Sequence, residues 1–263
     1  EYSMSIMKGK RGLIMGVANE RSIAWGIAKT LSENGAELAF SYQNESFRKR
    51  LIPLMNLIKS HICFECDVSN AANELNSIEN MFEKIQKKWN EIDFVVHALA
   101  YSDKEELKGK YVNCSRENFL NSLDISAFSF TRIAKSALPL MSSKGGSLLT
   151  LSYLGAERTL PNYNVMGVAK AALESTTRYL ANSLGQKGIR VNAISAGPVK
   201  TLAASGVKSF KKMLSYNAQR APLKRNISTS EVGNAAAFLC SEQAAYISGQ
   251  SISIDGGNST NFY

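Results

Sequence analysis

The sequence is poor in cysteine, histidine and acidic side chains, and these shortages limit what the protein can be. Its 263 residues include 4 cysteines, 2 histidines, and 22 Asp and Glu residues against 31 Lys and Arg residues. Four cysteines are too few to cross-link a chain of this length into a disulfide scaffold. No apolar run approaches the roughly 20 residues of a membrane-spanning helix, and no hydrophobic signal segment opens the chain. The sequence therefore predicts a cytoplasmic protein without a membrane partner.

Cys63 and Cys66 have a spacing that metal ligands often have, but we predict no metal site. Residues 62–68 have the pattern of a strand, in which side chains three positions apart point to opposite faces. No second pair of cysteines follows in the sequence. We therefore interpret both as buried structural thiols.

The basic side chains give a formal net charge of +9, which predicts attraction to an acidic partner. Lysines are spread through many segments instead of forming a basic tail. Neither zinc-finger spacing nor an aromatic RNA-binding motif accompanies them, so a nucleic-acid partner is not expected.

Short apolar runs alternate with longer amphipathic stretches along the whole chain. The strand-like runs are residues 12–15, 37–40, 62–66, 93–96, 147–151, 190–194 and 251–254. This alternation predicts one doubly wound (Rossmann-type) α/β domain over residues 1–263, with a seven-stranded parallel sheet and helices on both faces. Ligands of such sheets bind beyond the carboxyl ends of the strands. Because the chain begins with Glu1, we set residues 1–6 aside as a candidate cloning remnant.

A turn of small residues follows the first predicted strand, from Gly16 to Gly26, and leads into a helix. Small residues allow the backbone to approach a pyrophosphate, and a helix N-terminus offers free N–H groups. The turn lacks the usual G-x-G-x-x-G pattern, so an ordinary strand-to-helix turn remains an alternative. Its place in the first βα unit favours a dinucleotide.

The residues after the second and third predicted strands are candidates to bind the adenosine part of a dinucleotide cofactor. No Arg or Lys directly follows the second strand, where Gln43 stands, so NADH is favoured over NADPH, although Arg48 could reach a 2′-phosphate. Gln43 can hydrogen-bond a ribose or an adenine edge. Asp67 could accept from the adenine amino group or could cap a helix, and both interpretations stay open.

Tyr163 and Lys170 follow the fifth predicted strand, in a stretch predicted to be helical from Pro161 onward. Seven residues make two helical turns, roughly 10.5 Å, so the two side chains share one face. Hydride addition to an unsaturated thioester places negative charge on the thioester oxygen. A protonated tyrosine can donate a hydrogen bond to that oxygen.

The spacing of Tyr163 and Lys170 resembles that of a known family. Tyr163 and Lys170 have the Tyr-x6-Lys spacing of the bacterial enoyl-acyl carrier protein reductases, within the short-chain dehydrogenase/reductase superfamily, where Tyr-x3-Lys is commoner. The resemblance extends over nearly the whole chain and includes LSYLGAER at residues 151–158, PNYNVMG at 161–167 and RVNAISAGP at 190–198.

The resemblance implies a role for each site residue. Tyr163 would stabilise the enolate, Lys170 would hold the nicotinamide ribose, and Tyr153 would line the substrate pocket and assist protonation. Ser102 would also contact the substrate. The implied NADH contacts are Gly16, Ser22, Ile23, Gln43, Asp67, Val68, Leu99, Lys170, Val199, Lys200, Thr201, Leu202 and Ala203.

The resemblance also implies partners and a moving part. Residues from about 198 to 215 would form a substrate-binding lid, and the chain would assemble as a homotetramer. An acidic acyl carrier protein would deliver the enoyl substrate, with Lys208, Lys211 and Lys212 as candidate docking residues. The reaction would be the last reductive step of type II fatty acid elongation.

Two functions are alternatives to enoyl thioester reduction. A carbonyl (3-ketoacyl) reductase of the same superfamily would need Tyr-x3-Lys and an upstream serine, where this chain has Met166 and Tyr153. A non-catalytic dinucleotide-binding protein would have no reason to retain Tyr153, Tyr163 and Lys170 together.

Overall fold

The computed structural model describes residues 5–141, 143–201 and 210–261. Within these ranges lies one parallel sheet, and each pair of neighbouring strands runs in the same direction. The strand order is β3-β2-β1-β4-β5-β6-β7. The strands are β1 (Arg11–Met15), β2 (Glu37–Tyr42), β3 (Ile62–Glu65), β4 (Phe94–His97), β5 (Gly146–Ser152), β6 (Ile189–Ala196) and β7 (Ser251–Ile254). The predicted Rossmann-type fold is confirmed.

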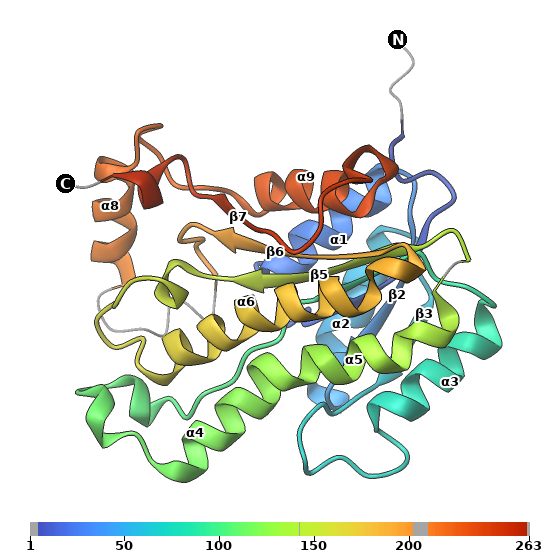
Figure 1. Cartoon of the computed structure of the whole chain (residues 1–263), viewed down its shortest axis with the longest axis horizontal. Helices are drawn as coiled ribbons and strands as arrows, with labels where there is room; N and C mark the ends of the chain where they lie inside the picture. The colour runs from blue at the N-terminus through green and yellow to red at the C-terminus, as the bar shows by residue number, and fades with distance from the viewer. Residues whose placement is uncertain (1–4, 142, 202–209, 262–263) are drawn as a thin grey trace.

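Helices cover both faces of the sheet (Figure 1). One face carries α1 (Ile23–Glu33), α2 (Glu45–Leu57) and α9 (Thr229–Cys240), and the other carries α3 (Ile78–Lys88), α5 (Ser129–Ala137) and α6 (Val165–Leu184). Helix α4 (Arg116–Leu123) continues through the π-helical turn η3 (Asp124–Phe128) into α5, and α8 (Phe210–Arg220) follows β6. The short 3₁₀ turns are η1 (Glu105–Leu107), η2 (Tyr111–Asn113), η4 (Leu138–Leu140), η5 (Leu154–Ala156), η6 (Gly185–Lys187), η7 (Glu242–Ala244) and η8 (Asn258–Thr260).

The sheet separates two buried hydrophobic clusters. Along β1, Ile14 packs toward α1 and α9, while Leu13 and Met15 pack toward α3 and α5, as the alternation of side chains along a strand requires. All three side chains are buried, which explains why the central strands appear in the sequence as continuous apolar runs.

The first described residues are part of the folded body. Ile6 packs against the cluster on the α1 face, Met7 is fully buried in it, and the Met7 amide donates to Asn34 O at 3.0 Å. The Ser5 hydroxyl also donates to Asn34 O, so residues 5 and 6, set aside in the sequence prediction, contact the domain.

Candidate active site

The predicted site residues gather at one edge of the sheet, beyond the carboxyl ends of the strands. Gly16 follows β1, Gln43 follows β2, Asp67 and Val68 follow β3, and Leu99 follows β4. Tyr153 follows β5, and Val199, Lys200 and Thr201 follow β6. The arrowheads of β5 and β6 point toward the side of the molecule where α8 lies (Figure 1). Two predicted cofactor residues, Leu202 and Ala203, lie outside the described residues.

Gly16 brings the first turn close to the neighbouring strand. Its φ is +104°, and an added Cβ would lie 1.9 Å from the carbonyl oxygen of Ala98, which follows β4. Only glycine has neither the steric penalty of this conformation nor a side chain to collide there. The turn therefore runs directly alongside the segment that contains Leu99.

The N-terminus of α1 has no side-chain cap. Ser22 occupies the N-cap position, but its hydroxyl donates to Asn19 O at 2.7 Å instead of accepting from the helix. Ile23, the first helical residue, is partly buried beside this turn. Helix N–H groups without a side-chain acceptor are the groups that bind an anion.

Gln43 and Asp67 lie at the ends of β2 and β3, which pair with each other. Gln43 is exposed and stands directly before Asn44, whose side chain caps α2 by accepting from the Ser46 and Phe47 amides. Asp67 accepts from the Ser69 amide at 2.9 Å within a local turn. The N-cap of α3 is Ser77, so Asp67 does not cap that helix.

Tyr153 and Tyr163 form an edge-to-face pair. Their ring centroids are 5.2 Å apart and the rings are inclined by 74°. The Tyr153 hydroxyl donates to Met213 Sδ on α8 at 3.9 Å. Burial raises the pKa of both hydroxyls, and for Tyr163 the proximity of Tyr153 adds to the rise. Both phenols are therefore protonated donors at neutral pH.

The predicted helical position of Tyr163 is wrong. Helix α6 begins at Val165, and Tyr163 lies in the preceding turn between Asn162 (φ 65°) and Asn164 (φ 47°). Positive φ values interrupt a right-handed helix, and asparagine tolerates them better than most residues. Lys170 is on α6, so the two side chains approach the site from different elements.

Lys170 is buried on α6, and its ammonium donates to Leu151 O on β5 at 2.8 Å. Burial lowers its pKa to about 8, and the charge of Glu174 opposes that shift. The ammonium has three donors, of which this bond uses one. Lys170 is therefore a buried cation held at the end of β5.

Ser102 is partly buried in the segment after β4. Its hydroxyl accepts from Asn118 Nδ2 at 3.1 Å and donates to Asp103 O at 3.2 Å. Asn118 belongs to α4, so this helix fixes the segment that leads from Leu99 to Ser102.

Beyond β6, Val199 is buried, Lys200 is exposed and Thr201 is partly buried. The Thr201 amide donates to Val199 O at 2.8 Å. The predicted lid is described only at residues 198–201 and from α8 onward, where Met213 contacts Tyr153. Lys208 lies outside the described residues, and of the other two candidate lysines the structure describes the exposed side chain of Lys212.

Residues 16–259 match the family model described as Enoyl-(Acyl carrier protein) reductase. The chain belongs to this family. The Rhizobium meliloti protein named enoyl-(acyl carrier protein) reductase (NADH) 1 is 52% identical over 255 residues, which cover 97% of this chain and 92% of that protein.

Solved structures of enoyl reductases have the same fold. FabI from Candidatus Liberibacter asiaticus has a TM-score of 0.94 and 47% identity, with 98% of each chain covered. The reductase from Anaplasma phagocytophilum, solved in complex with NAD, has a TM-score of 0.93 and 50% identity. That match covers 98% of this chain and 97% of the Anaplasma chain.

In this enoyl reductase, His97 at the end of β4 is a structural residue. It is fully buried, with Nδ1 2.8 Å from Thr150 Oγ1 and Nε2 2.8 Å from Ser129 Oγ. Burial, followed by the nearby Lys170 charge, lowers its pKa to about 3. The imidazole is therefore neutral at physiological pH.

This histidine should make the reductase less stable in acid. The unfolded chain binds a proton near pH 6.5 and the folded chain only near pH 3, so stability is lost as pH falls from 6.5 toward 3. Between pH 7 and pH 5 the loss from this group is about 2 kcal/mol. A His97→Asn variant should lose about 2 kcal/mol less than wild type over the same interval, measured by urea unfolding. The matched control His61→Asn, at an exposed histidine, should behave like wild type.

Two residues that the sequence prediction did not include position Tyr163 in this reductase. An added Cβ on Gly155, in η5, would lie 2.3 Å from Cδ1 of the Tyr163 ring, so only glycine leaves room for the ring. Asn164 Nδ2 donates to Glu106 O at 3.0 Å and to Gly109 O at 3.3 Å, which joins the tyrosine turn to the loop after β4. Asparagines on both sides of a tyrosine were the available signal, because asparagine is enriched at positive φ.

Three further structural features concern membrane helices, metal ligands and cysteines. Across the described ranges, no helix is long and apolar enough to cross a membrane. No group of three or more His, Cys, Asp or Glu side chains among the described residues could hold a metal ion. Cys63 is partly buried and Cys66 is buried, and both are free thiols.

Proposed function

We propose that this chain reduces trans-2-enoyl thioesters, carried on acyl carrier protein, to saturated acyl thioesters with NADH. The reaction is the last reductive step of type II fatty acid elongation. One observation carries the proposal: the protonated Tyr153–Tyr163 pair lies at the carboxyl edge of the sheet, where β5 also holds the buried Lys170 ammonium. Membership of the enoyl reductase family supports the same activity.

The residues present fit a dinucleotide. The close turn at Gly16 and the uncapped N-terminus of α1 suit a pyrophosphate, with Ser22 and Ile23 beside it. Gln43, Asp67 and Val68 would hold the adenosine, and Leu99 would lie beside the cofactor. Lys170 and residues 199–203 would hold the nicotinamide end.

NADH is favoured over NADPH because Arg48, the arginine that could reach a 2′-phosphate from α2, is already paired with a carboxylate. Arg48 NH1 lies 3.3 Å from Glu45 Oε1, and the Glu45 charge raises the arginine pKa. A 2′-phosphate there would compete with Glu45 for this cation, and Glu45 would repel it. The relative from Rhizobium meliloti is named for NADH.

The chain's own side chains would polarise and protonate the substrate. When bound, NADH supplies the hydride that the β-carbon of the enoyl thioester accepts. Tyr163 would donate a hydrogen bond to the thioester oxygen, where negative charge develops, and Tyr153 would assist protonation. Ser102 would contact the acyl group. Lys170 would orient the ribose and keep a positive charge near the reacting atoms.

The activity is tested by following NADH oxidation with a short trans-2-enoyl thioester, and separately with a 3-ketoacyl thioester. Turnover of the enoyl substrate alone is expected. Turnover of only the ketoacyl substrate would identify a carbonyl reductase, and binding of NADH without turnover of either would identify a non-catalytic protein. Parallel assays with NADPH should give the lower kcat/KM.

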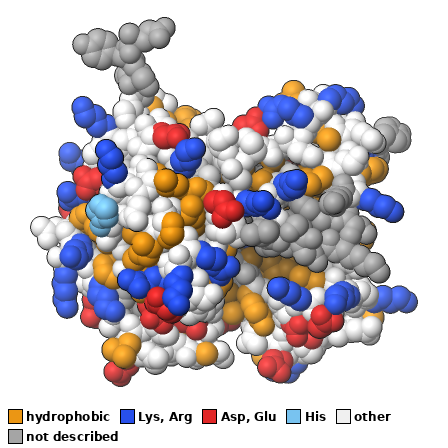
Figure 2. Space-filling view, turned by 180° about the vertical axis from the view of Figure 1, so that it is seen from behind, with side chains coloured by type: hydrophobic (Ala, Val, Ile, Leu, Met, Phe, Trp, Pro, Cys, Tyr) orange, Lys and Arg blue, Asp and Glu red, His pale blue; other side chains and the backbone are white. Residues whose placement is uncertain are grey.

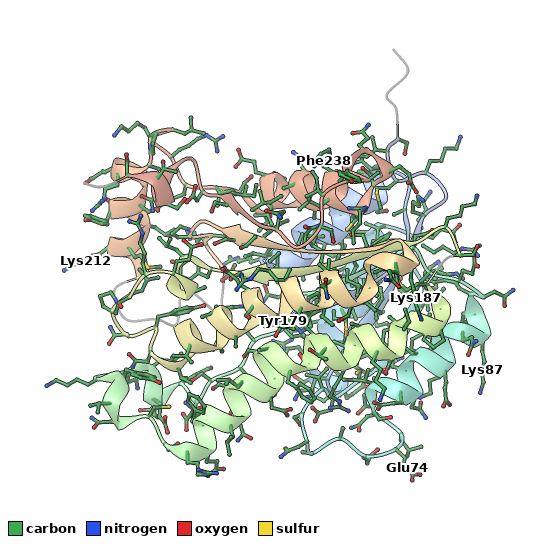
Figure 3. The ribbon with its side chains drawn as sticks, viewed as in Figure 1. Glu74, Lys87, Tyr179, Lys187, Lys212 and Phe238 are labelled. Atoms are coloured by element: carbon green, nitrogen blue, oxygen red, sulfur yellow. The ribbon has the colours of Figure 1, made fainter. Side chains whose placement is uncertain are left out.

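We also propose that acyl carrier protein docks beside α8, where Lys212 projects from the edge of the molecule (Figure 3). Lysine and arginine side chains are scattered over the face seen in Figure 2, which suits an acidic carrier. Lys212→Glu should lower kcat/KM for carrier-bound substrate by about threefold to tenfold at low salt. The rate with a small thioester should not change. Lys87→Glu, on α3 far from Lys212, is the matched control, and an equal loss there would contradict docking beside α8.

The proposed assembly is a homotetramer of single-domain chains, located in the cytoplasm. Apolar side chains are exposed along α4, η3 and α6, where Leu120, Phe128 and Tyr179 are 53%, 54% and 76% exposed. These elements are neighbours, and exposed apolar side chains on neighbouring elements are typical of a surface that another subunit covers. Sedimentation should give the mass of four chains.

A further inference from the structure

Glu174 is a buried acid that the proposed mechanism has not yet used. It is 8% exposed, stands one helical turn after Lys170 on α6, and lies on the same side of that helix. Its Oε1 accepts from the Ser152 hydroxyl at 2.5 Å. A carboxylate is rarely buried without a partner, since its desolvation is costly.

The two side chains bind consecutive residues of one strand. Lys170 donates to the carbonyl oxygen of Leu151, and Glu174 accepts from the side chain of Ser152. Tyr153 comes next in the chain. Two adjacent bonds therefore fix the end of β5 to α6 immediately before the tyrosine that faces Tyr163.

We propose that Glu174 is a positioning residue for the reduction: it keeps the Lys170 ammonium charged and, through Ser152, holds the end of β5 against α6. The inference rests on the proposed function, because it concerns the lysine that would hold the nicotinamide ribose. Glu174 acts through Lys170 and Ser152 and need not touch either substrate.

Glu174 is the acidic residue whose charge stabilises the Lys170 ammonium. His97, which feels the Lys170 charge, is neutral at pH 7 because burial lowers its pKa. The Tyr153–Tyr163 pair at the same edge of the sheet is neutral as well, because burial raises both tyrosine pKa values. Burial also lowers the pKa of Lys170, and Glu174 raises it. The remaining charged side chains on segments packed against α6 are Arg116, Glu117, Asp124, Arg132, Lys135, Lys187 and Arg190.

Replacing the charge should move the pH dependence of the enzyme. In Glu174→Gln the Lys170 pKa should fall from about 8 by about one unit. At pH 8 about one fifth as much ammonium would remain, so NADH affinity and kcat/KM should both fall about fivefold there and change little at pH 6. Fluorescence titration of NADH and steady-state kinetics from pH 6 to 9 give the two readouts. Glu83→Gln, at an exposed glutamate on α3, is the matched control.

Two further variants test the bond to Ser152. Ser152→Ala and Glu174→Asp keep the charge but remove or lengthen the contact, so kcat should fall about tenfold with the alkaline limb of the pH profile unmoved. Ser183→Ala removes an exposed hydroxyl from the same helix and should resemble wild type. If Glu174→Gln does not fold, these variants still test whether the contact between Ser152 and Glu174 affects kcat.

The outcomes separate this inference from the proposed function. If Glu174→Gln lowers NADH affinity and kcat/KM by the same factor at every pH, Glu174 contributes only to stability. That result would overturn the inference. An unchanged kcat in both Ser152→Ala and Glu174→Asp would overturn the role of the Ser152 contact. Failure of wild type to reduce an enoyl thioester would overturn the function instead, while the pH dependence of NADH binding would still report on Glu174.

Discussion

Replacing Tyr163 by phenylalanine should lower kcat by about 10²- to 10⁴-fold, because the variant has no hydroxyl to donate to the thioester oxygen. The ring packs between Tyr153 and the space left by Gly155, and phenylalanine fills the same volume. Folding and NADH binding should therefore change little. Stopped-flow kinetics under single turnover, combined with a fluorescence titration of NADH, measures both quantities.

The control for this experiment is Tyr179→Phe, which removes the same hydroxyl from a tyrosine that projects from α6 (Figure 3). It should retain wild-type kcat. Turnover by Tyr163→Phe within a factor of about three of wild type would exclude the hydroxyl as the main stabiliser of the developing charge.

The Gly16→Ala variant should lose both stability and cofactor binding. The φ of +104° strains any side chain, and the new Cβ would overlap the Ala98 carbonyl oxygen at 1.9 Å. Strain and overpacking together should cost about 3–5 kcal/mol, which lowers the Tm by about 10 °C. The turn must shift to relieve the overlap, so NADH affinity should fall as well.

Two other glycines separate the causes of that loss. Gly9 has a φ of +77°, and an added Cβ there would meet no atom within 4 Å, so Gly9→Ala reports the backbone strain alone. Gly185 has neither a positive φ nor a close neighbour, so Gly185→Ala should not destabilise the protein. Calorimetry compares the two variants. If Gly16→Ala lowers the free energy of unfolding no more than Gly9→Ala does, the overlap with Ala98 does not contribute to the loss.

The sheet and the edge that carries the site could be predicted because both follow from local patterns. Central strands of a parallel sheet are buried on both faces, so residues such as Leu13 and Ile14 form an uninterrupted apolar run. Once the strands are assigned, the residues after them must meet at one edge. Gly16 and Tyr153, which follow β1 and β5, therefore lie at the same edge although 137 positions separate them in the printed sequence.

The geometry around Tyr163 could not be predicted in the same way. Helical periodicity placed Tyr163 on the helix of Lys170, but the flanking asparagines adopt positive φ and delay the start of α6. Contacts such as Tyr153 with Met213 join segments 60 residues apart, and no local pattern encodes them. The bond between Ser152 and Glu174 likewise depends on how a strand and a helix pack.

The contact of the Tyr153 hydroxyl with Met213 has a thermodynamic consequence. A thioether is a weak acceptor, and the oxygen of a thioester is a stronger one. A thioester oxygen that accepted from Tyr153 as well as from Tyr163 would displace the sulfur and remove this contact between α8 and the site. By linkage, a change that breaks the Tyr153–Met213 contact would favour such binding by the same free energy with which the binding disfavours the contact.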